Sequence, residues 1–161
     1  MDEILDILAS DARRTPEEIS KLTGKDVATV KKAIKKFEQD GVIIKYKTVI
    51  NQDLVREKNS FVRALIEVSI VPQKDVGFDH IAERIYSFSE VKSCYLVSGS
   101  YDLLLVVEGE NSQTVAEFVS SKLSSMENVR QTTTHFLLKK YKEAGFASYQ
   151  EEKHERLKVV P

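Results

Sequence analysis

Four lysines between residues 31 and 36 are the group of side chains with the clearest chemical use in this 161-residue chain. They form two i, i+4 pairs, made by Lys31, Lys32, Lys35 and Lys36. Residues four apart share one face of a helix, so the four ammonium groups predict a single basic surface. Such a surface suits a groove lined with phosphates, and it is equally typical of a helix whose charged face is only solvated.

The residues around these lysines predict the helix that positions them. Apolar side chains recur three or four residues apart, at Val27, Val30, Ile34 and Phe37. This stripe leaves the lysines on the outer face. Asp26 fits the N-cap, because its carboxylate can accept from free amides of the first turn, and Gly41 fits a C′ position with positive φ.

Two shorter helices are expected before this one. Residues 2–12 carry apolar residues at helical spacing, namely Ile4, Leu5, Leu8 and Ala12. Thr15, Pro16 and Glu18 then predict a capping box with proline at N1, opening a helix that buries Ile19 and Leu22. A tight turn at residues 23–25 leads into the lysine helix. Three short helices joined in this way indicate a helix-turn-helix, whose third helix carries the cations and enters the DNA groove.

The segment after Gly41 is the second candidate for contact with DNA. Residues 42–50 (VIIKYKTVI) predict a strand, on which Lys45, Lys47 and the Tyr46 phenol can touch phosphate as a wing does. A linker strand with a solvated edge explains the same residues equally well. The full set expected at DNA comprises Ala28, Thr29, Lys31, Lys32, Lys35, Lys36, Lys45 and Lys47. Lysine is a point charge, so positioning on phosphates is expected more than reading of bases.

Charge and composition agree with a local basic patch. The formal net charge is −1, yet residues 25–47 hold seven lysines against three acids, a local charge of +4. The chain has one cysteine and no run of about 18 apolar residues, and its acidic start is no secretion signal. His80, His135 and His154 lack metal-ligand spacing. We therefore expect a cytoplasmic protein without a metal, cofactor or catalytic site.

The second half predicts a separate α+β domain after a polar linker at residues 51–60. Strands are expected at 61–71, 91–97, 103–108 and 129–141, and helices at 75–88 and from Asn111 to about Leu123. The order β-α-β-β-α-β is the ferredoxin-like plan, with both helices on one face of an antiparallel sheet. The other face carries apolar residues, so self-association is expected. Residues 142–161 are expected to form a loose extension or a short helix around 149–157.

The motifs taken together resemble the Lrp/AsnC family, the feast/famine transcriptional regulators. The similarity runs from about Asp2 to Tyr141, with IL..L at residues 4–8, the glycine-to-GVI pattern over 24–43, and G.YDLLL at 99–105. It implies a winged helix-turn-helix domain at 1–50 and a ferredoxin-like domain at 61–141. That domain dimerises through its sheet, often builds tetramers or octamers, and commonly senses an amino acid. Ala33 stands where the family usually has arginine, which implies a different operator.

An effector site is expected at the turn between the second and third strands. A glycine turn exposes backbone amides that can hold a ligand carboxylate. The turn residues are Ser98, Gly99, Ser100, Tyr101 and Asp102. Asp102 is expected to meet an ammonium group or to fix the turn. The resemblance adds hydroxyls of Thr132, Thr133 and Thr134 from a neighbouring subunit. A plain hairpin and strand-favouring threonines are the alternatives.

Two other functions compete with a DNA-binding regulator. Sirohaem decarboxylases resemble the family in both domains and use histidine and arginine around a tetrapyrrole. This chain has isolated histidines and no dense cluster of arginine and histidine. The other alternative is an assembly protein whose helix-turn-helix binds another protein.

Overall fold

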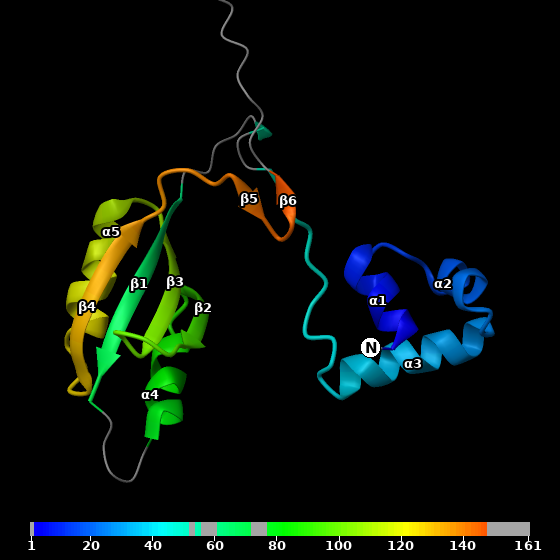
Figure 1. Cartoon of the computed structure of the whole chain (residues 1–161), viewed down its shortest axis with the longest axis horizontal. Coiled ribbons are helices and arrows are strands. Elements are labelled where there is room, and N and C mark those ends of the chain that lie inside the picture. The colour runs from blue at the N-terminus through cyan, green and yellow to red at the C-terminus, as the bar shows by residue number, and fades with distance from the viewer. Residues whose placement is uncertain (1, 52–53, 56–60, 72–76, 148–161) are drawn as a thin grey trace, which may run out of the picture. The chain divides into compact units, whose positions relative to one another are not determined.

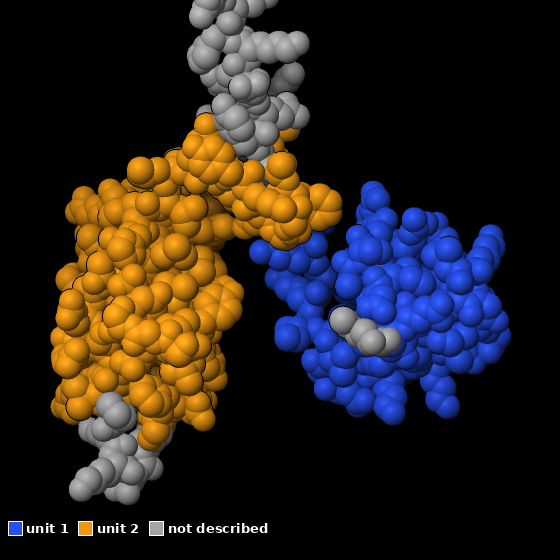
Figure 2. Space-filling model, in the orientation of Figure 1, with its two compact units in different colours: residues 1–50 blue, residues 51–161 orange. Residues whose placement is uncertain are grey.

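The computed structural model describes residues 2–51, 54–55, 61–71 and 77–147. The chain divides into two compact units, residues 1–50 and residues 51–161 (Figure 2). Each unit has its own apolar core. None of the helices in the described ranges is long and apolar enough to cross a membrane.

Three helices make up the first unit (Figure 1): α1 (Glu3–Ser10), α2 (Pro16–Thr23) and α3 (Val27–Gln39). The predicted capping box is confirmed, because Thr15 Oγ1 accepts from the Glu18 amide and the Glu18 carboxylate accepts from the Thr15 amide. Asp26 caps α3 by accepting from the Thr29 amide at 2.9 Å. Gly24 and Gly41 both take positive φ, which ends α2 and α3 as expected.

The core of the first unit is small and joins all three helices. Its buried members are Ile4, Leu8, Ile19 and Val30. The expected burial of Leu22 is wrong, since this side chain is 60% exposed. Leu22 lies in the last turn of α2, which ends at Thr23, beyond the small core that covers Ile19.

The predicted strand at residues 42–50 is wrong for this chain. These residues follow α3 without forming a strand, and no described residue makes a ladder with them. A strand needs a partner for its amides and carbonyls, and the sequence pattern does not say whether the same chain supplies one. Ile43 still packs at the edge of the helical core, and its amide donates to the Phe37 carbonyl at 3.0 Å.

The second unit contains the expected β-α-β-β-α-β order. Its elements are β1 (Val62–Ile70), α4 (Gly77–Tyr86), β2 (Val91–Leu96), β3 (Leu103–Gly109), α5 (Ser112–Phe118) with the π-helical turn η2 (Val119–Leu123), and β4 (Val129–Phe136). The four strands are antiparallel in the order β2-β3-β1-β4. Asn111 caps α5 by accepting from the Thr114 amide at 2.9 Å.

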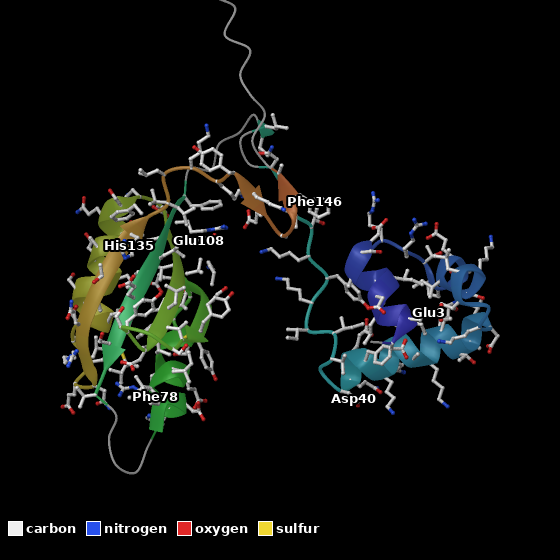
Figure 3. All side chains as sticks on the ribbon, viewed as in Figure 1. Glu3, Asp40, Phe78, Glu108, His135 and Phe146 are labelled. Atoms are coloured by element: carbon white, nitrogen blue, oxygen red, sulfur yellow. The ribbon has the colours of Figure 1, made fainter. Side chains whose placement is uncertain are left out.

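Both helices pack on one face of the sheet, which confirms the layering expected from sequence. Alternate residues of β1 and β3 are buried there against α4, α5 and η2, namely Ala64, Ile66, Val68, Ile70, Leu103, Leu105 and Val107. The intervening residues point to the open face, where Leu65, Leu104 and Val106 are half-buried. Figure 3 marks Glu108 on β3 and His135 on β4. The His135 Nε2 atom lies 3.1 Å from Glu67 Oε1.

The chain beyond β4 departs from the prediction. The expected strand to Tyr141 ends at Phe136, which pairs with Ala64. One further bond runs from the Leu137 amide to the Arg63 carbonyl at 2.9 Å, and β1 begins only one residue before Arg63, so it cannot pair as far as Tyr141. A small hairpin follows, with β5 (Lys142–Glu143) and β6 (Phe146–Ala147). The helix predicted around residues 149–157 lies outside the described residues.

The hairpin is attached to the sheet by an ion-pair network. Arg63 on β1 lies 2.6 Å from Glu108 of β3 and 2.9 Å from Glu143 of β5. Lys140 also pairs with Glu143. In the turn of the hairpin, Ala144 has a φ of 49° and Gly145 a φ of 87°. Ala144 therefore lies in the left-handed region, which residues with a Cβ rarely adopt.

Gly109→Ala is expected to destabilise the second unit. A Cβ at this position would lie 3.0 Å from Val115 Cγ2 and 3.3 Å from the Val115 amide nitrogen. Val115 is buried in the core, so the contact cannot relax freely. We expect a loss of about 1–3 kcal/mol in the free energy of unfolding, measured by urea denaturation.

Gly99→Ala is the matched control for this substitution. A Cβ at Gly99 meets no atom within 4 Å. Its effect on the free energy of unfolding should stay within about 0.5 kcal/mol. Equal denaturation midpoints for the two variants would contradict the close packing at Gly109.

Candidate functional site

The basic face of α3 is exposed, and its opposite face is packed. Lys31, Lys32, Lys35 and Lys36 are all exposed. The apolar stripe faces the core, with Val30 fully buried and Ile34 and Phe37 packed beside it. Ala33 also packs against this core, so at this position the surface of α3 carries no long side chain. The helix therefore offers four cations on a rigid support.

Side chains at the start of α3 are arranged by its cap. Thr29 is exposed, and its hydroxyl donates to Asp26 Oδ2, which leaves the hydroxyl oxygen to accept. Ala28 is exposed as well. The hydrogen bonds from Thr29 lower the pKa of the Asp26 carboxyl, so Asp26 carries a negative charge at neutral pH. The negative charge of Asp26 lies at the start of α3, so it would repel a phosphate that approached the first turn of this helix.

One lysine of the basic face is already paired. The Lys31 Nζ atom lies 2.9 Å from Glu17 Oε1 on α2. The hydrogen bond from Lys31 is the main cause of a lowered pKa at Glu17, so the carboxylate stays ionised at neutral pH. Glu17 thus offsets part of the charge of Lys31. Residue spacing alone does not predict this contact, because it depends on how α2 crosses α3.

The segment after α3 presents its cations without strand structure. Lys45 and Lys47 are exposed on an extended stretch. The Tyr46 hydroxyl donates to Glu38 Oε1 near the end of α3 at 3.0 Å. Burial is the main cause of a raised pKa at Tyr46, and the bond to Glu38 adds to it. The Tyr46 hydroxyl is therefore already hydrogen-bonded within the chain, and the neighbouring Lys45 and Lys47 are accessible to another molecule.

The turn between β2 and β3 is held to β1 by Asp102. The Asp102 amide donates to the Val68 carbonyl at 3.1 Å, and Asp102 Oδ2 accepts from the Ile70 amide at 2.7 Å. The Val97 amide donates to the Asp102 carbonyl at 2.9 Å, which closes the turn. Of the two roles expected for Asp102, fixing the turn is the one that these contacts perform.

The remaining turn residues are accessible. Ser98, Gly99 and Ser100 are exposed, and Tyr101 is half-buried. Gly99 does not have a positive φ, and a Cβ there would meet no atom within 4 Å. Nothing in the described part of this chain therefore requires glycine at position 99. Its lack of a side chain leaves the backbone of the turn open to another molecule.

The three threonines of β4 lie on two faces of the sheet. Thr132 and Thr134 pair with the buried Val68 and Ile66 and so face the helix side. Thr133 pairs with Glu67 and points to the open face. One ligand on one face of a single chain therefore cannot meet all three hydroxyls. Among the described residues, no cluster of histidine, cysteine, aspartate or glutamate is arranged to hold a metal ion.

Comparison with known proteins connects these two regions to known domains. Residues 3–44 match winged helix-turn-helix DNA-binding domains, and residues 63–145 match the Lrp/AsnC ligand binding domain. An uncharacterized HTH-type transcriptional regulator of Bacillus subtilis, YugG, is 45% identical over 99% of this chain and 95% of its own length. The HTH-type transcriptional regulator LrpA of Pyrococcus abyssi is 28% identical, over 86% of this chain and 94% of its own.

Solved structures share the fold. A transcriptional regulator of Neisseria meningitidis, crystallised in complex with L-methionine, is 26% identical with a TM-score of 0.68, over 89% of this chain and 92% of its own. The structure of AsnC from Escherichia coli has 22% identity and a TM-score of 0.63, over 86% of this chain and 89% of its own, which supports the fold alone.

Glu17→Gln is expected to strengthen DNA binding. The substitution frees the Lys31 ammonium from its 2.9 Å ion pair and leaves it available to a phosphate. We expect affinity for duplex DNA to rise about two- to fivefold, the scale of an exposed ion pair. For a dimer with two such lysines, the plot of log affinity against log salt should steepen by about 2.

Fluorescence anisotropy with a labelled duplex at several salt concentrations measures both quantities. Glu83→Gln on α4 is the matched control, since it makes the same charge change in the other unit. Identical affinities and slopes for the two variants would remove Lys31 from the DNA surface.

Proposed function

Because the chain belongs to the Lrp/AsnC family of transcriptional regulators, we propose that α3 docks in a groove of duplex DNA and that the β2–β3 turn binds an amino acid. The protein is a DNA-binding regulator, not an enzyme; the relatives give no support to the sirohaem-decarboxylase or assembly-protein alternatives. We place its action in the cytoplasm, where DNA is accessible. The observation that carries the DNA proposal is a set of four exposed cations on a helix whose other face is buried.

Geometry favours α3 over the other helices as the groove element. It is the longest of the three, with 13 residues, and its four lysines are exposed, although Lys31 pairs with Glu17 of α2. A recognition helix needs a buried face to hold it and an exposed face to enter the major groove. Lys32, Lys35 and Lys36 then contact phosphates, with Ala28 and Thr29 near the bases. Lys45 and Lys47 add contacts outside the groove.

Lys35→Glu is expected to weaken binding to all DNA sequences. The variant replaces a phosphate contact by a repulsive charge without touching the core. We expect at least about a tenfold loss of affinity for both the upstream DNA of its own gene and an unrelated duplex, measured by gel shift. For wild-type protein neutralising about six phosphates per dimer, log affinity should fall with log salt at roughly −5.

Lys142→Glu on β5 makes the same charge change in the other unit and should leave DNA affinity unchanged. Equal gel-shift midpoints for Lys35→Glu and Lys142→Glu would overturn the assignment of α3.

The turn suits a ligand that carries a carboxylate. Exposed serines flank an accessible glycine, and Asp102 holds the loop against β1 through two hydrogen bonds. A fixed loop with open backbone amides can bind a carboxylate at little ordering cost. The Neisseria meningitidis regulator crystallised with L-methionine supports an amino acid as the ligand class. In this proposal Asp102 positions the turn, and hydroxyls from β4 of a neighbouring subunit complete the site.

Gly99→Val tests the turn. The side chain finds open space in the chain, so the fold is retained, but it covers the backbone that the ligand approaches. Each of the twenty amino acids at millimolar concentration is added in a thermal-shift assay, beginning with L-methionine. We expect at least one to raise the melting temperature of wild-type protein by about 2 °C or more, and Gly99→Val to lose most of that shift.

The control for this assay is Gly99→Ala, whose smaller side chain should retain a partial shift. Flat melting temperatures for wild-type protein with all twenty amino acids would remove the effector proposal and leave the DNA proposal intact.

We also propose that the regulator acts as a homodimer, from which tetramers or octamers can be built. Leu65, Leu104 and Val106 on the open face of the sheet are accessible, and Tyr95 beside them is 53% exposed. Residues 42–50 include Ile44, which is 93% exposed, together with accessible Val49 and Ile50. A second copy would cover such surfaces and bring two α3 helices to one duplex.

A further inference from the structure

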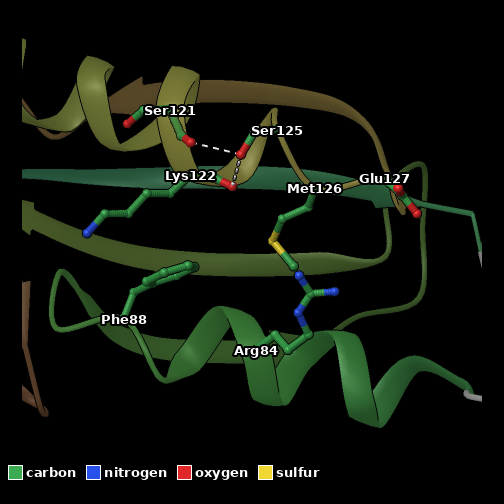
Figure 4. Close-up of a pocket in the computed structure, with 7 residues that line it drawn as sticks. All are labelled: Arg84, Phe88, Ser121, Lys122, Ser125, Met126 and Glu127. Carbon is green, nitrogen blue, oxygen red and sulfur yellow. Dashed lines mark hydrogen bonds between the residues drawn. The ribbon is translucent and has the colours of Figure 1, made fainter.

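A cavity of about 510 Å³ lies between the two helices that cover the sheet. Arg84 of α4 and Phe88 just after it form one wall (Figure 4). The other wall comes from η2 and the residues that follow it, with Ser121, Lys122, Ser125, Met126 and Glu127. Small-molecule sites usually occupy about 300–1,000 Å³, so this cavity has room for a small metabolite.

Lys122, one of the two cations at the cavity, already forms an ion pair. The Lys122 Nζ atom lies 2.6 Å from Glu90 Oε1 and 5.1 Å from the centre of the Phe88 ring. The hydrogen bond from Lys122 is the main cause of a lowered pKa at Glu90, so the pair stays ionised and neutral overall at physiological pH. Lys122 therefore shapes the wall and adds no net charge to it.

Arg84 is the cation available to a ligand. Its side chain is exposed, and among the described residues its guanidinium makes no hydrogen bond or ion pair; only its backbone carbonyl accepts, from the Ser87 hydroxyl at 2.8 Å. Figure 4 shows its side chain extending from α4 toward Met126. A guanidinium offers a planar fork of donors that matches a carboxylate in two hydrogen bonds. One side of the cavity thus presents donors with a positive charge.

The opposite wall presents acceptors. The Ser125 hydroxyl donates to the carbonyls of Ser121 and Lys122, at 2.8 and 3.0 Å, and the Ser121 hydroxyl donates to the Glu117 carbonyl. With their hydrogens used, both oxygens can only accept from a ligand. Glu127 adds an ionisable carboxylate to the lining. A complementary ligand carries a carboxylate for Arg84 and a donor group for the serines and Glu127.

The wall that holds these acceptors contains the π-helical turn. The Ser124 amide donates to the Val119 carbonyl, five residues earlier, at 2.8 Å. This wider turn replaces the α-helical pattern where Ser121 and Lys122 face the cavity. Single π-turns within helices are rare and occur often at functional sites.

The cavity and the β2–β3 turn are fixed to neighbouring residues of the sheet. The Val71 amide donates to the Asn128 carbonyl at 2.9 Å, next to Glu127. The Ile70 amide donates to Asp102 of the turn at 2.7 Å. Two adjacent residues at the end of β1 therefore hold the cavity wall and the turn, which gives a short physical connection between them.

We propose that this cavity is a second small-molecule site, which binds a small organic carboxylate carrying a hydrogen-bond donor, of the amino-acid or hydroxy-acid class. Arg84 holds the carboxylate, and the serine oxygens and Glu127 accept from the ammonium or hydroxyl group. Met126 and Phe88 form the apolar part of the lining. The site lies within one chain and does not depend on ligand binding at the β2–β3 turn.

The test uses full-length protein with the Gly99→Val substitution, so that the turn is blocked. L-serine, L-methionine and L-lactate are titrated and followed by isothermal calorimetry. We expect millimolar or tighter binding of at least one probe, and a loss of about tenfold or more when Arg84→Gln removes the charged donor. Arg130→Gln on β4 removes the same charge outside the cavity and should leave the binding unchanged.

A second variant identifies the role of the acceptor wall. Glu127→Gln should weaken binding of the ammonium-bearing probes severalfold and that of L-lactate much less, because the glutamine oxygen still accepts from a hydroxyl but no longer attracts a positive charge. Absence of binding by all three probes, or equal affinities in Arg84→Gln and Arg130→Gln, would overturn the proposal. Neither result would affect the DNA proposal, whose readout is a gel shift without added ligand.

Discussion

The packing of β1 in the middle of the sheet is the constraint on which the second unit depends. Every second residue from Ala64 to Ile70 is buried against the helices, which fixes the register with β3 and β4 and sends the intervening residues to the open face. The same strand holds the turn through Ile70 and the C-terminal hairpin through Arg63. A one-residue slip would exchange the two faces and displace both attachments at once.

The first unit is held together by a much smaller core than the second unit. Four buried side chains join three short helices, so most of the surface of α3 is left for contact with another molecule. The caps at Thr15 and Asp26 set where α2 and α3 begin, and the helical spacing of the apolar residues determines which side of α3 faces the core. In the ion pair between Glu17 and Lys31, a residue of α2 offsets part of the positive charge on the basic face of α3.

Local patterns predicted the elements whose partners lie within the same chain. The capping box, the Asp26 cap and the glycine at the end of α3 depend on nearby residues, and the structure contains each of them. The strand expected at 42–50 and the extension of β4 to Tyr141 failed because pairing needs a neighbour that periodicity does not reveal. Leu22 followed helical spacing but lies beyond the small core, and contacts such as Arg63 to Glu143, 80 residues apart, leave no signature in spacing.

The turn of the C-terminal hairpin affects how firmly residues 142–147 are held to the sheet. A two-residue turn with both φ values positive favours asparagine or aspartate followed by glycine, and this chain has Ala144 in the first place. Two strands of two residues supply few hydrogen bonds to offset that backbone strain. The backbone pairing of the hairpin is therefore weak, and the hairpin is held in place by the charges of Arg63, Lys140 and Glu143. Raising the ionic strength should therefore loosen residues 142–147 from the sheet before the rest of the unit melts.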